Sequence, residues 1–354
     1  MHARRISIAD LAAEPVVGGG GLFGDGAAVS LPLVLVDLDT ADGVTDGDLT
    51  RAVDRASASD VILMGTSTGP LDDALNPLLE ALDLTCAPTG TGHRSVVAAD
   101  DVDAAVAVFT DAVSRCPQAS LVAAQVVRAA EPLDPVAAID VESLGYSTLQ
   151  GGDEFGRWLE ARRAKGRPLP PPAVDPVLLD RQAGTLRITL NRPGRRNAYG
   201  TARRDALVEA LRLAVLDDSI DRIIIDGAGS SFCAGGDLDE FGHMPDSSTA
   251  HLIRTRGGAG RLVSTLADKV EVRLHGHCVG AGIEIPAFAG HIVAAPDTRI
   301  RLPEVAMGLI PGAGGTVSVP RRIGRWRALY LFVTGAEIDA QQALDWGLVD
   351  EIRE

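Results

Sequence analysis

Short apolar runs alternate with amphipathic stretches in the first hundred residues. The run over 33–38 is unbroken, as is typical of a strand that is buried on both faces. The elements expected after it are a helix over 46–56, a strand over 61–64, a helix over 71–82 and extended segments over 84–87 and 95–98. This alternation predicts an α/β layer over residues 31–99. Residues 1–30 are expected to form a leader that precedes it.

The pattern changes after residue 99. Residues 100–165 have helical periodicity with acidic starts, which predicts a helical region. Residues 166–176 contain five prolines and are expected to form an extended linker. Beyond it, a strand over 186–190, a helix over 202–216 and a strand over 222–226 predict a second α/β unit over 177–354. The fold class expected for the chain is therefore α/β.

Composition and charge narrow the class of protein. The chain has 354 residues, enough for about two domains, and 46% of them are hydrophobic. Its 33 basic and 48 acidic residues leave a net charge of -15, which disfavours binding to nucleic acid or to an anionic membrane surface. No run approaches the ~18 apolar residues of a membrane span, and no signal peptide is evident. A cytoplasmic protein is expected.

Cysteines give no sign of a metal site. The four of them lie far apart, without Cys-X-X-Cys or Cys/His spacing, which is typical of reduced thiols. Neither a metal nor a disulfide is expected.

Glycine-rich turns in the second unit are candidates for chemistry. Phe232-Cys-Ala-Gly-Gly-Asp-Leu-Asp239 follows a predicted strand, and His275-Gly-His-Cys-Val-Gly-Ala-Gly-Ile-Glu284 joins a strand to an apolar helix. Small side chains in such turns leave backbone N–H groups open to a ligand, and a helix start favours negative charge. The segments Leu302-Pro-Glu304 and Gly308-Leu-Ile-Pro-Gly-Ala-Gly-Gly-Thr316 follow.

Two glutamates stand alone among apolar neighbours, and two interpretations of them remain open. Glu284 and Glu304 could face one cavity, hold a water and divide acid and base work. Alternatively, each could cap a turn or pair with a cation such as Arg299 or Arg301.

Together these segments resemble the crotonase superfamily of enoyl-CoA hydratases and isomerases, over about half of the chain. The matching motifs are Asn191-Arg-Pro193, Arg196-Asn-Ala198, Phe232-Cys-Ala-Gly-Gly-Asp237, Gly280-Ala-Gly-Ile-Glu284, Leu302-Pro-Glu304, Gly308–Thr316, Leu331-Phe-Val-Thr-Gly335 and Ala343–Val349. The resemblance implies a crotonase-like ββα spiral core and an acyl-CoA thioester substrate.

The resemblance also implies roles for particular residues. The amides of Gly236 and Ala281 would form an oxyanion hole for the thioester oxygen, and Glu284 and Glu304 would add water across a 2-enoyl-CoA double bond. Isomerases of the family typically keep one of these acids, so both together favour hydration. Coenzyme A would enter as part of the substrate, and no other cofactor is implied. The residues implied to contact coenzyme A are Arg192, Arg195, Arg196, Ala234, Asp237 and Leu238.

Chain order departs from the family pattern. Members continue past the Gly-Leu-Val segment with helices that complete the core and build a trimer, whereas residues 141–163 resemble those helices. We expect residues 100–165 to act as a helical lid and trimerisation region, for this chain or for a neighbour in a homotrimer or hexamer. Residues 31–99 would then be a degenerate crotonase-like unit. Arg162, Arg163 and Lys165 are further candidates for coenzyme A contact.

Other functions are alternatives. Gly65-Thr-Ser-Thr-Gly69 has the spacing of a nucleophile elbow, and Gly280-Ala-Gly282 has part of a dinucleotide fingerprint, with Ile285 in place of the third glycine. Within the family, an enoyl-CoA isomerase, an acyl-CoA hydrolase and a non-catalytic acyl-CoA-binding or assembly subunit remain possible.

Overall fold

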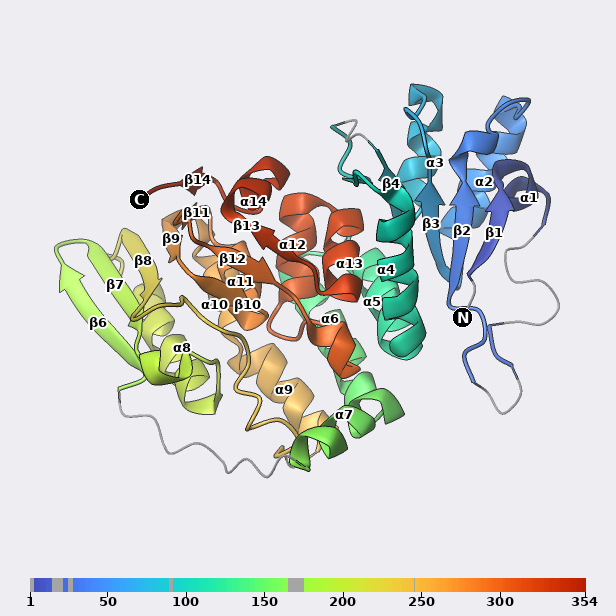
Figure 1. The fold of residues 1–354 in the computed structure, drawn as a ribbon. Coiled ribbons are helices and arrows are strands. Elements are labelled where there is room, and N and C mark those ends of the chain that lie inside the picture. Colours follow the sequence, from blue (N-terminus) through green and yellow to red (C-terminus); the bar gives the residue numbers. More distant parts are fainter. Residues whose placement is uncertain (1–2, 15–21, 25–27, 89–91, 165–174, 245) are drawn as a thin grey trace.

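Three parts of the chain lie side by side in the computed structural model, which describes residues 3–14, 22–24, 28–88, 92–164, 175–244 and 246–354. A small sheet with its helices forms the N-terminal part, four helices form the middle, and the second α/β unit forms the rest. Figure 1 shows the middle helices between the blue N-terminal sheet and the yellow to red core.

The N-terminal part is a single parallel sheet with both faces covered. Its strands run in sequence order: β1 (Arg4–Ser7), β2 (Leu33–Asp37), β3 (Ile62–Thr66), β4 (Leu84–Ala87) and β5 (Val96–Ala98). The helices of this part are α1 (Ile8–Ala13), α2 (Asp46–Ser57) and α3 (Asn76–Ala81). Alternation along β2 explains its unbroken apolar run, because Leu33 and Leu35 join the main core while Val34 and Val36 join the cluster under α1 and α2.

The expected leader over 1–30 is wrong, because the chain start belongs to the sheet. β1 pairs with β2, and Ser7 begins α1 with a capping box that Asp10 completes. Ile8 and Leu11 are fully buried. β1 and α1 are too short to show a hydrophobic period, so the sequence pattern did not predict them. Whether this sheet is a degenerate crotonase-like unit remains a prediction.

The expected helix over 71–82 is shorter in the structure. A 3-10 turn, η3 (Asp73–Leu75), leads into α3, and Pro77 lies in the first turn of that helix. A proline fits there because its missing N–H has no helical acceptor to lose.

Four helices occupy the predicted helical stretch: α4 (Val102–Arg115), α5 (Pro117–Ala130), α6 (Pro135–Gln150) and α7 (Asp153–Arg163). They pack on the second unit of the same chain, where α5 and α6 contact α12 (Gly315–Ile323) and α4 and α5 contact α13 (Arg325–Thr334). Most of the expected linker over 166–176 lies outside the described residues.

The second unit contains two sheets. The larger has the order β14-β11-β9-β8-β7-β6 and is parallel except for its edge strand β6, and the smaller has the order β10-β12-β13. Their strands are β6 (Val177–Gln182), β7 (Thr185–Leu190), β8 (Arg222–Gly227), β9 (Val270–Leu274), β10 (His277–Val279), β11 (His291–Ala294), β12 (Arg299–Arg301), β13 (Glu337–Asp339) and β14 (Glu351–Ile352). The remaining helices are α8 (Thr201–Leu216), α9 (Ser247–Gly257), α10 (Ala259–Thr265), α11 (Ala281–Glu284) and α14 (Ala340–Trp346). The strands expected over 186–190 and 222–226 and the helix expected over 202–216 are confirmed as β7, β8 and α8.

A buried charge cluster ties the N-terminal sheet to the rest. Asp83, 1% exposed, accepts from the Leu63 amide at 2.8 Å and from Arg128 Nε at 2.7 Å, and Arg325 lies 3.8 Å away. Beside it, Trp326 Nε1 donates to the Leu82 carbonyl at 2.9 Å. The sheet is therefore fastened to α5 and α13 by buried, directional contacts.

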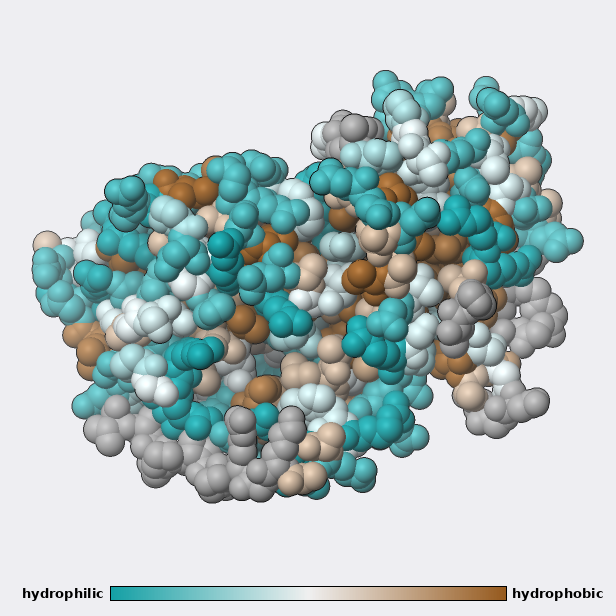
Figure 2. Space-filling view, viewed as in Figure 1, coloured by the Kyte–Doolittle hydropathy of each residue, from teal (hydrophilic) through white to brown (hydrophobic). Residues whose placement is uncertain are grey.

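The face of the molecule seen in Figure 2 is mostly polar. In Figure 2 hydrophilic side chains cover most of the visible face, and apolar ones form small separate patches. No helix in the described ranges is long and apolar enough to cross a membrane.

Candidate active site

A cavity of about 520 Å³ lies between the second unit and α6. The four residues predicted to do the chemistry, Gly236, Ala281, Glu284 and Glu304, all line it. Residues of α6, α9 and α10 complete its wall. The structure therefore brings both glycine-rich turns and both lone glutamates to one place.

The two turns contact each other through their backbones. The Val279 amide donates to the Cys233 carbonyl at 2.9 Å, and a methyl group on Gly282 would lie 2.2 Å from that same oxygen. Only glycine at 282 permits this approach. Among the described residues, the amides of Gly236 and Ala281 have no backbone acceptor. Ala281 begins α11, where an N–H has no partner within the helix, so both donors are available to a ligand.

Glu284 is held by the backbone of another turn. It is 2% exposed, and its Oε2 accepts from the amides of Ala313 at 2.7 Å and Gly315 at 3.0 Å. Burial and the nearby carboxyl groups raise its pKa well above the ordinary value, while the two amides act in the opposite direction. Glu284 therefore caps a turn and also lines the cavity, and its role as an acid or base stays a prediction.

Glu304 and Glu284 both approach Gly280. A methyl group on Gly280, whose φ is +49°, would lie 2.3 Å from Glu304 Oε1 and 3.6 Å from Glu284 Oε1. These two oxygens are thus at most about 6 Å apart, so both carboxyl groups face the same small space beside Gly280. Among the described residues Glu304 Oε2 has no hydrogen-bond partner, and burial raises the pKa of Glu304 to about 8.

Sequence reasoning missed a third buried glutamate, Glu142 on α6. Its Oε1 accepts from the Gly314 amide at 2.7 Å, and its Oε2 accepts from the Thr316 amide and hydroxyl, both at 2.8 Å. Four successive amides over 313–316, at the start of α12, thus alternate between Glu284 and Glu142. Burial raises the pKa of Glu142 to about 7. The middle helices therefore contribute a charged group to the cavity wall.

Two arginines predicted to contact coenzyme A lie behind the wall. Arg192 and Arg195 pair with Asp237 at 3.1 and 2.6 Å, and Arg195 also reaches Asp239 at 2.6 Å. Asp237 itself lines the cavity and is 1% exposed. These guanidinium groups neutralise the acidic turn, so a phosphate would compete with Asp237 and Asp239 for them.

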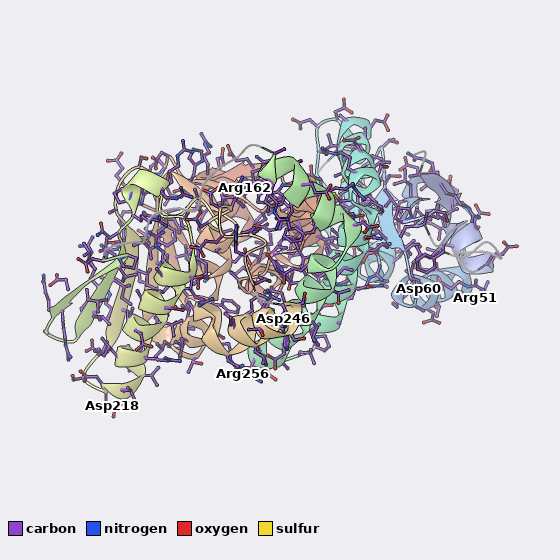
Figure 3. The ribbon with its side chains drawn as sticks, turned by 90° about the horizontal axis from the view of Figure 1, so that it is seen from below. Arg51, Asp60, Arg162, Asp218, Asp246 and Arg256 are labelled. Carbon is purple, nitrogen blue, oxygen red and sulfur yellow. The ribbon has the colours of Figure 1, made fainter. Side chains whose placement is uncertain are left out.

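The other coenzyme A candidates lie outside the wall as well. Arg196 is exposed, and neither Arg196, Ala234 nor Leu238 is among the described residues that line the cavity. Arg162 lies at the end of α7 and is labelled in Figure 3. Its side chain donates to the Leu238 carbonyl at 2.9 Å and pairs with Asp239. Arg163 lies near Gly242, and Lys165 is outside the described residues. Contact of any of these residues with coenzyme A stays a prediction.

The geometry does not support the alternative catalytic site at Ser67. The Ser67 hydroxyl donates to Asp39 Oδ1 at 2.6 Å, so its proton is bound to a carboxylate rather than to the histidine that a nucleophile elbow requires. In the described part of the chain, no group of three or more His, Cys, Asp or Glu side chains is placed to share a metal ion.

Comparison with known proteins identifies relatives of the second unit. The profile of the family described as "Enoyl-CoA hydratase/isomerase" matches residues 180–353. The 2,3-dehydroadipyl-CoA hydratase of Escherichia coli (strain K12) is 35% identical over 176 residues, which cover 50% of this chain and 68% of that relative. The 1,2-epoxyphenylacetyl-CoA isomerase of the same organism is 32% identical over 181 residues, with 50% and 69% covered.

Solved structures include an enoyl-CoA hydratase from Thermoplasma volcanium GSS1, with 30% identity, a TM-score of 0.48, and 51% of this chain and 72% of that chain covered. The hydratase relative is matched over more than two thirds of its length, and the family profile covers the segment that carries both glutamates and both turns. The chain therefore belongs to the enoyl-CoA hydratase/isomerase family.

Proposed function

We propose that this protein adds water across the double bond of a 2-enoyl-CoA thioester. The observation that carries the proposal is the pair of buried carboxyl groups, Glu284 and Glu304, which both approach Gly280 in a cavity that two uncommitted amides also line. Hydration needs a base for the water and an acid for the α carbon, whereas moving a double bond needs only one group that carries a proton between carbons.

The amides of Gly236 and Ala281 would donate to the thioester oxygen. Negative charge develops on that oxygen when hydroxide adds to the β carbon, and one such donor is worth about 3–4 kcal/mol of barrier. Coenzyme A enters this scheme as part of the substrate.

The carboxyl pair would hold at least one proton at neutral pH, because burial raises the pKa of Glu304 to about 8, and burial together with the charge of Glu304 raises the pKa of Glu284. Two amides stabilise negative charge on Glu284, so we assign it as the base that takes a proton from the water. Glu304, whose Oε2 has no partner among the described residues, would hold the proton and deliver it to the α carbon. Protonation of the enolate gives the 3-hydroxyacyl thioester, and transfer of the proton from Glu284 to Glu304 would restore the starting state.

Absorbance of a conjugated 2-enoyl-CoA tests this proposal, since hydration removes the conjugation. The wild-type protein should consume the absorbance, and Glu284→Gln or Glu304→Gln should slow the reaction at least about 10²-fold. Glu154→Gln is a matched control, because Glu154 is a buried glutamate of α7 outside the cavity wall and accepts from the Gln118 and Ala119 amides. Binding of acyl-CoA without any loss of absorbance would instead support a non-catalytic binding subunit.

A further inference from the structure

Arg254 on α9 presents a charged group to the cavity with only neutral partners. Its guanidinium lies 4.4 Å from the centre of the Tyr146 ring. Its Nε donates to Ser143 Oγ at 3.0 Å, one Nη donates to Gln150 Oε1 at 3.2 Å, and the other donates to Ser147 Oγ. These bonds use three of the five N–H groups of an arginine, so two remain.

No carboxylate of a described residue lies within 4.0 Å of Arg254. Burial lowers its pKa, while Tyr146 and Glu142 raise it. Glu142 is committed to the amides of α12, so it does not serve Arg254 as a direct partner. A guanidinium stays charged in proteins, and a desolvated charge is costly unless a counter-charge meets it.

The other two arginines that line the described cavity each have a carboxylate within 4.0 Å. Arg204 pairs with Asp205 at 2.7 Å, and Arg261 donates to the Thr255 carbonyl and has Asp140 at 4.0 Å. Arg254 therefore stands out among the cations that line the described cavity.

One ring separates Arg254 from the reacting centre. The Tyr146 ring also packs on the turn that holds Glu284, since a methyl group on Gly312 would lie 2.4 Å from Tyr146 Cδ2. Apolar side chains of α6 and α9 line the same cavity, namely Ile139, Ala250 and Ile253. In Figure 3 the labels Asp246 and Arg256 mark the two ends of α9. An acyl chain that starts at the glutamates can thus continue along apolar wall and end at a cation.

We propose that Arg254 binds an anionic group at the far end of the acyl chain, so that the substrate is a 2-enoyl-CoA with a terminal carboxylate. This inference rests on the proposed function. A phosphate of coenzyme A is the other source of negative charge in such a substrate, and the two sources make different predictions.

Two 2-enoyl-CoA substrates with equal carbon number, one ending in a methyl group and one in a carboxylate, distinguish them. Wild-type kcat/KM should be at least about tenfold higher for the carboxylate-ended substrate, because an apolar end leaves the cation unpaired. Arg254→Met should remove that preference, chiefly through KM, and should change kcat/KM for the methyl-ended substrate less than about threefold. Arg254→Lys should restore part of the preference. Arg261→Met, which alters a cavity arginine with a carboxylate nearby, should leave the preference unchanged.

A wild-type preference for the methyl-ended substrate would overturn the inference without any variant. Equal losses for both substrates in Arg254→Met would also overturn it, and would point to a coenzyme A phosphate or to packing of α9 on α6. Equilibrium binding of the saturated carboxylate-ended acyl-CoA provides an arm that needs no turnover. If Arg254→Met binds it at least about tenfold more weakly than wild type does, but binds the saturated methyl-ended acyl-CoA as tightly as wild type does, the inference holds even where hydration fails.

Discussion

The substitution Glu142→Gln tests how far the middle helices determine the chemistry. The carboxylate accepts three hydrogen bonds, one from the Gly314 amide and two from Thr316. Glutamine can accept through its single carbonyl oxygen only, and its NH₂ group would face an N–H donor. Hydrogen bonds to a charged acceptor are worth about 1.5–3 kcal/mol each, so the variant should lose about that much stability.

The same change should reach the chemistry through the shared turn. The amides of Ala313 and Gly315, which hold Glu284, alternate along the chain with those that hold Glu142. A looser turn misplaces the base, and a loss of about 1.4–2.7 kcal/mol in transition-state binding lowers kcat about 10- to 100-fold. Glu142 also raises the pKa of Glu284 and of Glu304 by charge repulsion. Removing its charge should lower both pKa values and shift the pH profile of kcat towards acid.

The assay is kcat against pH for wild type, Glu142→Gln and the matched control Glu154→Gln, with urea unfolding for each. Both variants remove a buried carboxylate that accepts backbone amides at a helix start, but only Glu142 lines the cavity. The control should lose stability and keep its kcat and pH profile. If Glu142→Gln behaved in the same way, Glu142 would be structural and the reasoning from the shared turn would be refuted.

Three further substitutions test the same set of contacts. Gly280→Ala should lower kcat at least about tenfold, because the new methyl group would lie 2.3 Å from Glu304 Oε1 and the backbone φ at this residue is +49°. Unchanged kinetics would exclude this position for the Glu304 carboxyl group. Asp83→Asn should lower the free energy of unfolding in urea by about 3–5 kcal/mol, since it removes the carboxylate that pairs with Arg128 and leaves Arg325 with Glu131 alone, at 3.2 Å. Glu304→Gln should gain stability relative to wild type as pH rises from 4.5 to about 8. In wild type the folded state retains a proton on Glu304 that the unfolded chain has lost, so the stability of wild type is present below pH 4.5 and is lost towards pH 8. Parallel pH–stability curves for the two proteins would contradict this.

Local patterns indicated both glycine-rich turns and both lone glutamates, and the resemblance to the crotonase superfamily added the amides of Gly236 and Ala281. The two glycine-rich turns and the positions of Glu284 and Glu304 follow from short segments whose strand, turn and helix sequence is set by nearby residues, and all four predicted groups line one cavity. The buried run at β2 likewise follows from the burial of both sheet faces. The assignment of acid and base depends on which oxygen meets which amide, and that information is not in the spacing.

Contacts between residues far apart in the chain could not be predicted from the sequence pattern. Arg192 and Arg195 look like free cations in the sequence, but Asp237 and Asp239, some 42–45 residues away, pair with them. The signal for Glu142 was present, since it occupies the same helical stripe as other buried residues of α6. Those residues are Ala138, Ile139, Ser143, Tyr146 and Leu149. A carboxylate in such a stripe is costly to bury unless it is bonded, and its partners lie 172 and 174 residues away.

The order of segments along the chain matters less to this site than the contacts between them. α6 precedes the core in sequence, yet it supplies Glu142 to the turn over 313–316 and Tyr146 to the cavity wall. Moving a segment from one end of a chain to the other changes only which loops must close, and loop closure costs about 0.6 kcal/mol for each doubling of length. Each buried bond to a charged oxygen is worth more than that. The contacts of α6 can therefore hold the same amides, and support the same chemistry, from either end of the chain.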